Sequence, residues 1–166
     1  MVEESDLRTV LQMVWNATLR LPVNRWDASI IQPDIRSMLA GYVSITGDWS
    51  GYVGIHAHWP VARQAASIMF DIREDAVTNA DVNDAFGELA NQIGGKLEGL
   101  LPEPCAISLP VVLDGSAFLQ QIPCAELLFQ VTAESGGYPL MVTLVESLPS
   151  RQSLRHRFYS VTDAVP

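Results

Sequence analysis

Apolar residues recur at helical spacing from residue 79 to residue 101. At about 100° per residue, the large apolar side chains of this stretch fall within an arc of roughly 80°. They are Val82, Phe86, Leu89, Ile93, Leu97 and Leu100. Asp84, Glu88, Asn91 and Gly95 fall within a second arc of roughly 60° on the opposite side. The pattern predicts a long helix with one face in the core and an outer ridge of two acids, a carboxamide and a glycine.

Glycines are unusually frequent in this predicted helix, which has Thr78 or Asn79 as its N-cap and stops at Pro102. The glycines inside it are Gly87, Gly94, Gly95 and Gly99. Each costs about 1 kcal/mol relative to alanine, so we expect them to have a role. Close packing against another element suits Gly94, near the boundary of the two faces. Alternatively, Gly95 and Gly99 keep the outer ridge low so that another protein can approach it. Both interpretations stay open at this stage.

The same period predicts two more amphipathic helices. The first covers residues 5–21, capped by Ser5 and ended by Pro22. Its inward stripe comprises Leu7, Val10, Leu11, Val14, Ala17 and Leu21. The second begins at Pro60, which suits a first helical turn. Its inward residues are Val61, Ala65, Ile68 and Met69. Residues 22–36 show no clear period and predict an irregular connection with room for a short edge strand.

Elsewhere the period changes to two. Residues 39–45 and 52–57 alternate in this way and predict a hairpin with its loop at residues 47–51. Three later strands are predicted at residues 105–113, 124–132 and 138–146. Asp114-Gly115 supplies a turn before the last two strands, which should pair as a hairpin through residues 135–137. Helices together with strands joined by tight turns predict an α+β fold, a mostly antiparallel sheet with helices packed on it.

Composition indicates one domain. The chain has 166 residues, of which 48% are hydrophobic and 17% charged, and this length can bury a core without disulfides or metals. We expect a single domain over residues 1–166, with its core at about 5–147 and a C-terminal tail at 148–166. Cys105 and Cys124 match no redox or metal motif, so we expect both to be reduced.

Charge and hydropathy argue against two classes of partner. The net charge is −9, whereas nucleic-acid binding needs clustered lysine and arginine to neutralise phosphates. Apolar runs fall short of the roughly 18 to 20 residues that span a bilayer, and the N-terminus lacks the basic start of a signal peptide. We therefore expect a cytoplasmic protein that binds neither nucleic acid nor membrane.

The residues of the outer ridge form the motif Asp84-x-x-x-Glu88-x-x-Asn91, followed by Pro110. The stretches that surround it read VSITGDWSGYVGI (43–55), GELANQIGGKLEGLLP (87–102) and CAISLPVVLDG (105–115). Motif and stretches together resemble the CheX/CheC/FliY family of chemotaxis phosphatases over most of residues 5–147. The motif occurs once, which is similar to the CheX branch. The resemblance implies a CheC/CheX-like layered fold, the same architecture that the periodicity predicts.

The resemblance also implies a reaction and roles for the ridge residues. The substrate is the phosphoaspartate of a CheY-like response regulator, and Asn91 orients the attacking water. Glu88 pairs with the active-site lysine of the regulator. Glu88 and Asn91 lie three residues apart on one helical face, so their side chains can enter a single pocket together. Asp84, Gln92 and Gly95 are expected to contact this partner, although Asp84 could instead only shape the helix. Mg²⁺ is expected on the regulator, and this chain is expected to need no cofactor of its own.

A homodimer formed through sheet edges is implied by resemblance to the CheX branch. The sequence is compatible with it, because Leu127, Phe129 and Val131 alternate with residues 126, 128 and 130. Leu128 is thereby an apolar residue on the more polar face of its predicted strand. Unpaired strand edges of this kind invite strand addition.

Other interpretations of the sequence remain. The domain could bind a receiver without turnover, as an adaptor in a signalling complex, or its ridge could be an ordinary polar helix face. His56 and His58 lie two apart on a predicted strand, a spacing that can bind zinc. No third ligand occurs at motif spacing, so a solvated strand face is the alternative. Ser108 lacks the sequence context of a catalytic nucleophile.

Overall fold

The computed structural model describes residues 2–26, 33–102, 104–122 and 124–148. The helices are α1 (Glu4–Leu19), α2 (Trp59–Phe70), α3 (Asn79–Glu98) and α4 (Gly115–Gln121). The strands are β1 (Asn24–Arg25), β2 (Leu39–Gly47), β3 (Gly51–Ala57), β4 (Cys105–Ile107), β5 (Val111–Asp114), β6 (Ala125–Ser135) and β7 (Tyr138–Ser147). The expected C-terminal tail lies, apart from its first residue, outside the described residues.

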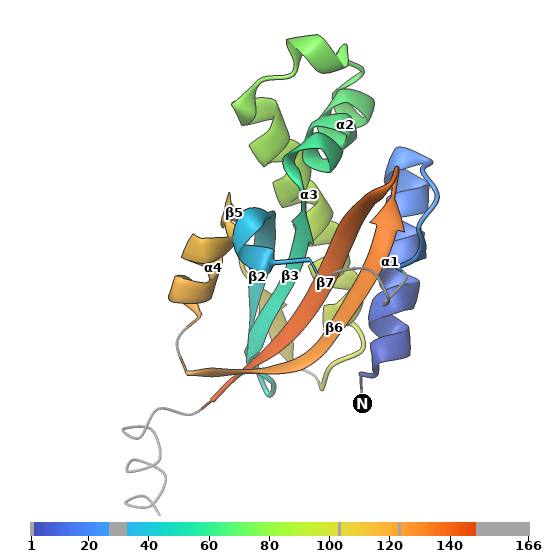
Figure 1. Cartoon of the computed structure of the whole chain (residues 1–166). Helices are drawn as coiled ribbons and strands as arrows, with labels where there is room; N and C mark the ends of the chain where they lie inside the picture. The colour runs from blue at the N-terminus through green and yellow to red at the C-terminus, as the bar shows by residue number, and fades with distance from the viewer. Residues whose placement is uncertain (1, 27–32, 103, 123, 149–166) are drawn as a thin grey trace, which may run out of the picture.

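The seven strands form one sheet in the order β1-β6-β7-β3-β2-β4, with β5 also paired to β2. Each of these pairings is antiparallel. Both predicted hairpins are confirmed: β2 pairs with β3, and β6 pairs with β7 through a turn at Gly136 and Gly137. Figure 1 shows the sheet with β3 and β7 at its centre. The predicted α+β fold with a mostly antiparallel sheet is confirmed.

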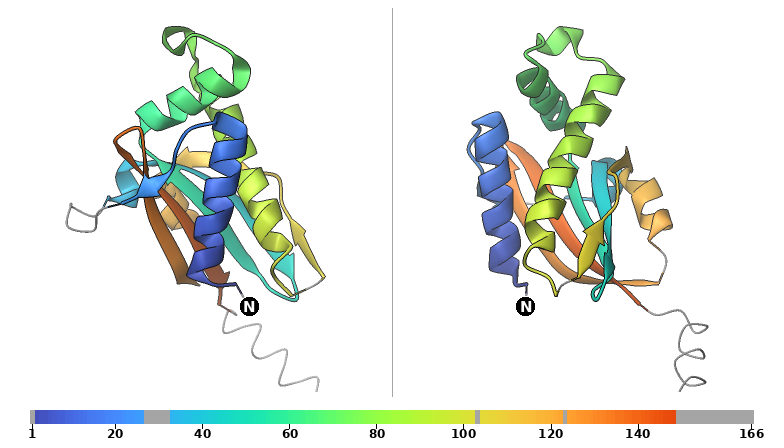
Figure 2. Two further views of the ribbon diagram at one scale, coloured as in Figure 1. Left: turned by 90° about the vertical axis from the view of Figure 1, so that its right-hand side faces the viewer. Right: turned by 180° about the vertical axis from the view of Figure 1, so that it is seen from behind.

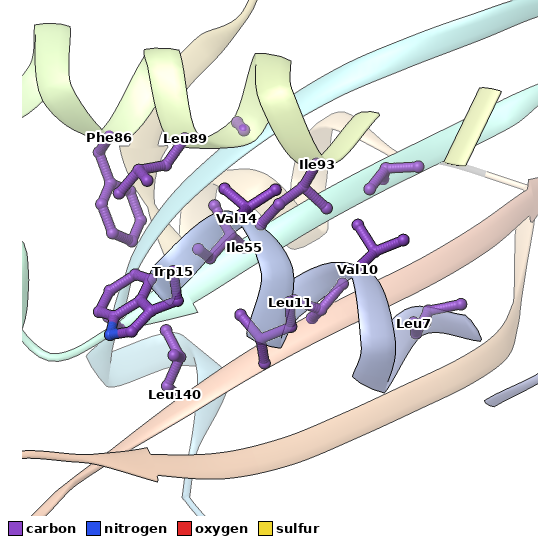
Figure 3. Packing of buried hydrophobic residues seen from close by; sticks show 14 of the residues in the cluster. Leu7, Val10, Leu11, Val14, Trp15, Ile55, Phe86, Leu89, Ile93 and Leu140 are labelled. Atoms are coloured by element: carbon purple, nitrogen blue, oxygen red, sulfur yellow. The ribbon is translucent and has the colours of Figure 1, made fainter. Parts of the chain in front are cut away.

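Helices cover the two faces of this sheet unequally. α1 and α3 lie side by side on one face, with α2 packed against α3, while the short α4 lies on the opposite face (Figure 2). The main core fills the space between α1, α3 and the sheet. Figure 3 shows its members Leu7, Val10, Leu11, Val14, Trp15, Ile55, Phe86, Leu89, Ile93 and Leu140. α3 is therefore held in place by its apolar face, which leaves the opposite ridge free.

The predicted inward residues of α3 are buried up to Leu97. The prediction is wrong for Leu100, because its side chain is 46% exposed. α3 ends at Glu98 with Gly99 as its C-cap, so Leu100 no longer follows the helical phase. Gly99 is therefore at the end of the helix and not inside it as predicted.

The other two long helices are also rotated or shortened relative to the prediction. α1 ends at Leu19, with Arg20 as a left-handed C-cap, and Ala17 is exposed. The sequence pattern missed Trp15, which is fully buried and donates its indole N–H to Ser135 Oγ at 3.0 Å. In α2, Ile68 is exposed and small alanines are buried in its place. Alanine on this face lets α2 approach its neighbours closely.

Two predictions for the second half of the chain are wrong. The strand expected at residues 105–113 is interrupted at residues 108–110 and forms β4 and β5. The turn expected at Asp114-Gly115 is the start of α4, because the Asp114 carboxylate accepts a hydrogen bond from the Ala117 backbone N–H and caps the helix. Phe118 of α4 packs with Ala40 and Tyr42 on the second face of the sheet.

A β-bulge changes the faces of β6. The pairing with β7 shifts between Leu127 and Phe129, so the regular alternation is broken at this point. Leu127 is 53% exposed, whereas Leu128 packs against the main core. The expected orientation of these two leucines is therefore reversed.

Candidate functional site

The helix that carries the motif starts at a complete capping box. Thr78 Oγ1 accepts a hydrogen bond from the Asp81 backbone N–H at 3.2 Å. In return, the Asp81 carboxylate accepts bonds from the Thr78 backbone N–H at 2.8 Å and from the Thr78 hydroxyl at 2.6 Å. These two bonds lower the pKa of Asp81, and the bond from the Thr78 hydroxyl has the larger effect. The resulting negative charge is favourable at a helix N-terminus. The first turns of α3 are thus held in a defined geometry.

The predicted ridge points away from the core. Asp84, Glu88 and Gly95 are exposed, and Asn91 is half-buried. An open pocket of about 360 Å³ lies between α3 and the connection from β4 to β5. Its lining residues are Asn83, Asp84, Gly87, Glu88, Pro110 and Val112. Two acids of the motif and the proline that follows it in the sequence therefore meet in one pocket, while Asn91 lies on the next turn of α3, outside the pocket lining.

The connection between β4 and β5 is pinned to β2 beside this pocket. Ser108 Oγ accepts a hydrogen bond from the Ser44 backbone N–H at 3.0 Å and donates to the Leu109 carbonyl at 2.8 Å. The Ser108 backbone N–H donates in turn to the Ser44 carbonyl at 2.9 Å. Ser108 thus has a structural role, which agrees with its lack of a nucleophile motif. These bonds hold Pro110 against α3, where a Cβ at Gly87 would lie 3.6 Å from the proline ring.

The two adjacent glycines in the middle of α3 have different surroundings. A Cβ added at Gly94 would overlap the Cγ2 methyl of Val43, which is fully buried on β2. A Cβ added at Gly95 would meet no neighbouring side chain or element within 4 Å. Gly94 therefore allows close helix–sheet packing, as one of the two interpretations held. Gly95 is not required by packing and leaves a low, open position on the ridge.

Gln92 connects the ridge to α1. Its Nε2–H donates to Glu88 Oε1 at 2.9 Å, and its Oε1 accepts a hydrogen bond from the Thr18 hydroxyl at 2.9 Å. Gln92 was expected to contact the partner, and the sequence did not predict these two bonds within the protein. A polar residue at position i+4 from Glu88 is the only local signal for the first bond. Nothing local indicates the second, because Thr18 and Gln92 are 74 residues apart.

The histidine pair does not form the arrangement that its spacing predicted. β3 ends at Ala57, and His58 is the N-cap of α2, outside the strand. His56 is fully buried, within hydrogen-bond distance of Thr143 Oγ1 at 3.0 Å and beside the Phe118 ring at 4.9 Å. A solvated strand face is therefore also wrong, because α4 covers this position. Desolvation lowers the pKa of His56 to about 3, so the ring is neutral.

Within the residues that the structure describes, no group of three or more histidine, cysteine or acidic side chains is placed to hold a metal ion. Across the same ranges, none of the helices combines the length and apolar composition needed to cross a bilayer. Cys105 and Cys124 are both free.

A long helix packed across a mostly antiparallel sheet is the α+β arrangement of CheC/CheX-like domains. The chain belongs to the CheX family, since the family model described as chemotaxis phosphatase CheX matches residues 39–130. That match contains the whole motif and Pro110. A search of curated proteins finds no match.

Solved structures with a similar fold include several CheX proteins. The chemotaxis protein CheX of Vibrio vulnificus has a TM-score of 0.64 and 16% identity, with coverage of 84% of this chain and 93% of that one. A CheX from Desulfovibrio desulfuricans gives 0.62 and 15%, with coverage of 86% and 97%. CheX in a CheX–CheY–BeF3–Mg²⁺ complex from Borrelia burgdorferi gives 0.64 and 15%, with coverage of 89% and 100%. At these identities the likeness establishes the fold.

Proposed function

We propose that this chain is a phosphatase that hydrolyses the phosphoaspartate of a CheY-like receiver domain. The observation that carries the proposal is the pocket in which Asp84, Glu88 and Pro110 meet, on a ridge whose next turns bear Asn91 and the open Gly95. Membership of the CheX family supports the reaction. The Borrelia complex, in which a CheX protein is bound to CheY, supports the choice of partner. In this proposal both proteins act in the cytoplasm.

The reaction needs a positioned water more than it needs a strong base. The water oxygen bonds to phosphorus while the bond from phosphorus to the aspartyl oxygen breaks, which releases inorganic phosphate and a carboxylate. A carboxamide can accept one hydrogen bond and donate another, so Asn91 can orient this water in line with the breaking bond. Asn91 remains neutral and cannot take up the proton, which passes to a phosphate oxygen. Phosphoryl transfer depends mainly on such positioning and on electrostatic stabilisation.

Glu88 is proposed to bind the lysine of the receiver's active site. It is exposed and lies one turn before Asn91, so the two side chains can enter the partner together. Asp84 lines the same pocket one turn earlier and adds negative charge next to a cationic group of the partner. The Mg²⁺ of this reaction belongs to the receiver. The chain's own residues supply the charge and the water-orienting amide.

The proposed assembly also includes a homodimer. β6 is paired with β7 along its length, whereas β1 pairs only with Ala133 and Glu134 on its other side. Over residues 125–132, no described strand occupies that edge, and Leu127 is exposed beside it. An open edge with an apolar side chain favours addition of a strand from a second copy. Light scattering should give twice the 18.2 kDa mass of one chain, and a mass near 18.2 kDa would contradict the dimer.

The function is tested with a CheY-like receiver phosphorylated on its aspartate by a small acyl phosphate in the presence of Mg²⁺. Loss of phosphate from the receiver should be faster when the parent protein is added. Asn91→Ala should abolish most of the acceleration and change the free energy of unfolding by no more than about 0.5 kcal/mol, because Asn91 lies opposite the core. Asn16→Ala is the matched control, since Asn16 is exposed on α1 and lies outside the ridge.

Each outcome of this assay has a distinct meaning. Acceleration that depends on Asn91 supports the phosphatase. Binding of the phosphorylated receiver without acceleration would replace the phosphatase by an adaptor. Acceleration that survives Asn91→Ala would contradict the role of this residue in orienting water.

A further inference from the structure

We propose that Thr18 and Gln92 are positioning residues for Glu88. They form a chain of two hydrogen bonds that runs from α1 across to the ridge of α3. The inference rests on the proposed phosphatase function, because it concerns how Glu88 is held before the receiver arrives. It assigns to Gln92 a role within the protein in place of the expected contact with the partner.

The end groups of the chain determine its direction. A carboxylate can only accept hydrogen bonds, so Gln92 must turn its NH2 group towards Glu88, with 2.9 Å between Nε2 and Oε1. The amide oxygen of Gln92 then faces Thr18, 2.9 Å from the hydroxyl oxygen. A hydroxyl is able to donate, and it does so here. The amide therefore has one orientation that satisfies both neighbours, because a flipped amide would set its oxygen against the Glu88 carboxylate and lose that bond.

A second threonine in α1 shows that the bond from Thr18 is not the default. Thr9 donates its hydroxyl to the Ser5 carbonyl one turn earlier, at 2.8 Å, which is the common local bond of a helical threonine. Thr18 instead donates its hydroxyl to Gln92 on α3. Both residues are half-buried, so water competes less for this bond than for a bond on an open surface.

These two hydrogen bonds order the Glu88 side chain before the lysine of the receiver arrives. A free glutamate side chain loses rotamer freedom when it forms an ion pair, and ordering it beforehand reduces that cost. Gln92 occupies Oε1 of Glu88, and no hydrogen bond from another described residue reaches Oε2. Oε2 is therefore available to the incoming ammonium group. Since Gln92 is held by Thr18, the placement of α1 beside α3 becomes part of the site.

The kinetic test uses Thr18→Val, which removes the hydroxyl and keeps the shape, and Gln92→Leu, which removes the amide. Ordering one such side chain corresponds to about a two- to tenfold change in association. Each variant should therefore lower kcat/KM for the phosphorylated receiver by about two- to tenfold, mainly through KM. The double variant should lose no more than the single ones, because either change breaks the same chain. Thr18→Ser should retain parental kinetics, and Thr9→Val should be without effect.

A measurement on the free protein separates this inference from the proposed function. NMR resonances of the Gln92 side-chain amide should shift in Thr18→Val and remain in place in Thr9→Val. If the parent protein failed to accelerate dephosphorylation, the proposed function would be wrong. The amide resonances would still decide whether the hydrogen bonds from Thr18 to Gln92 and from Gln92 to Glu88 exist. The inference is overturned if Thr18→Val behaves like Thr9→Val in either measurement, or if Thr18→Ser is impaired as much as Thr18→Val.

Discussion

Gly94 and Gly95, adjacent in α3, should respond in opposite directions to the same substitution. At Gly95, no neighbouring side chain or element lies within 4 Å of the position that an alanine Cβ would take. Alanine in a helix interior is favoured over glycine by about 1 kcal/mol. Gly95→Ala should therefore raise the free energy of unfolding by up to about 1 kcal/mol, equivalent to a Tm about 2 to 4 °C higher for a chain of this size.

Gly94→Ala gains the same helix propensity but meets Val43. The new methyl would overlap Val43 Cγ2, and this β-branched side chain is fully buried on β2 and has few rotamers to move into. Overpacking of this kind costs about 1 to 3 kcal/mol. After the gain of about 1 kcal/mol in propensity, a net loss of up to about 2 kcal/mol remains. The two variants should thus differ by about 1 to 3 kcal/mol, with Gly95→Ala the more stable.

Thermal melts and dephosphorylation rates, measured on both variants, test the placement of the ridge. Gly95→Ala should slow dephosphorylation although it stabilises the fold, because a methyl group then stands one turn beyond Asn91 on the proposed docking surface. Gly95→Leu should slow the reaction further while the protein stays folded. Gly94→Ala should melt earlier and retain the parental rate in its folded fraction. A lower melting temperature for Gly95→Ala together with normal activity would refute the reasoning, because Gly95 would then face the interior.

Three further predictions concern Glu88, His56 and Trp15. Glu88→Gln removes the charge and keeps the shape, so KM for the phosphorylated receiver should rise and depend less on salt concentration; unchanged kinetics would remove the lysine contact. Burial lowers the pKa of His56 from 6.5 to about 3. Between these two pH values the unfolded protein binds a proton at this residue that the folded protein does not bind. The stability that His56 contributes is therefore present above pH 6.5 and is lost as the pH falls towards 3. Urea titrations should show a shallower loss across this window for His56→Leu, and an equal slope would contradict the assignment. Trp15→Phe leaves the buried Ser135 hydroxyl without its indole donor and should cost at least about 1 to 3 kcal/mol, which an unchanged melting temperature would disprove.

The sequence by itself determined the two faces of α3. Helical geometry places residues at about 100° intervals whatever surrounds the helix, so the burial of Phe86 and Ile93 and the exposure of Glu88 followed from their spacing. The hairpins followed in the same way from a period of two and from glycines at the turn of residues 135–137. These are local properties, and they were sufficient to predict the fold class and to find the candidate ridge.

Tertiary structure decided which residues become neighbours across the chain. His56 alternates like a solvent-facing strand residue, but Phe118 of α4 covers it, and the Asp114 side chain caps the start of that helix. The hydrogen bond from Thr18 to Gln92 likewise depends on two helices that lie side by side although far apart in sequence. The spacing of apolar residues describes the faces of one helix or strand and carries no information on what packs against it. The ridge could therefore be found from the sequence, whereas the groups that hold Glu88 in place required the folded arrangement of α1 against α3.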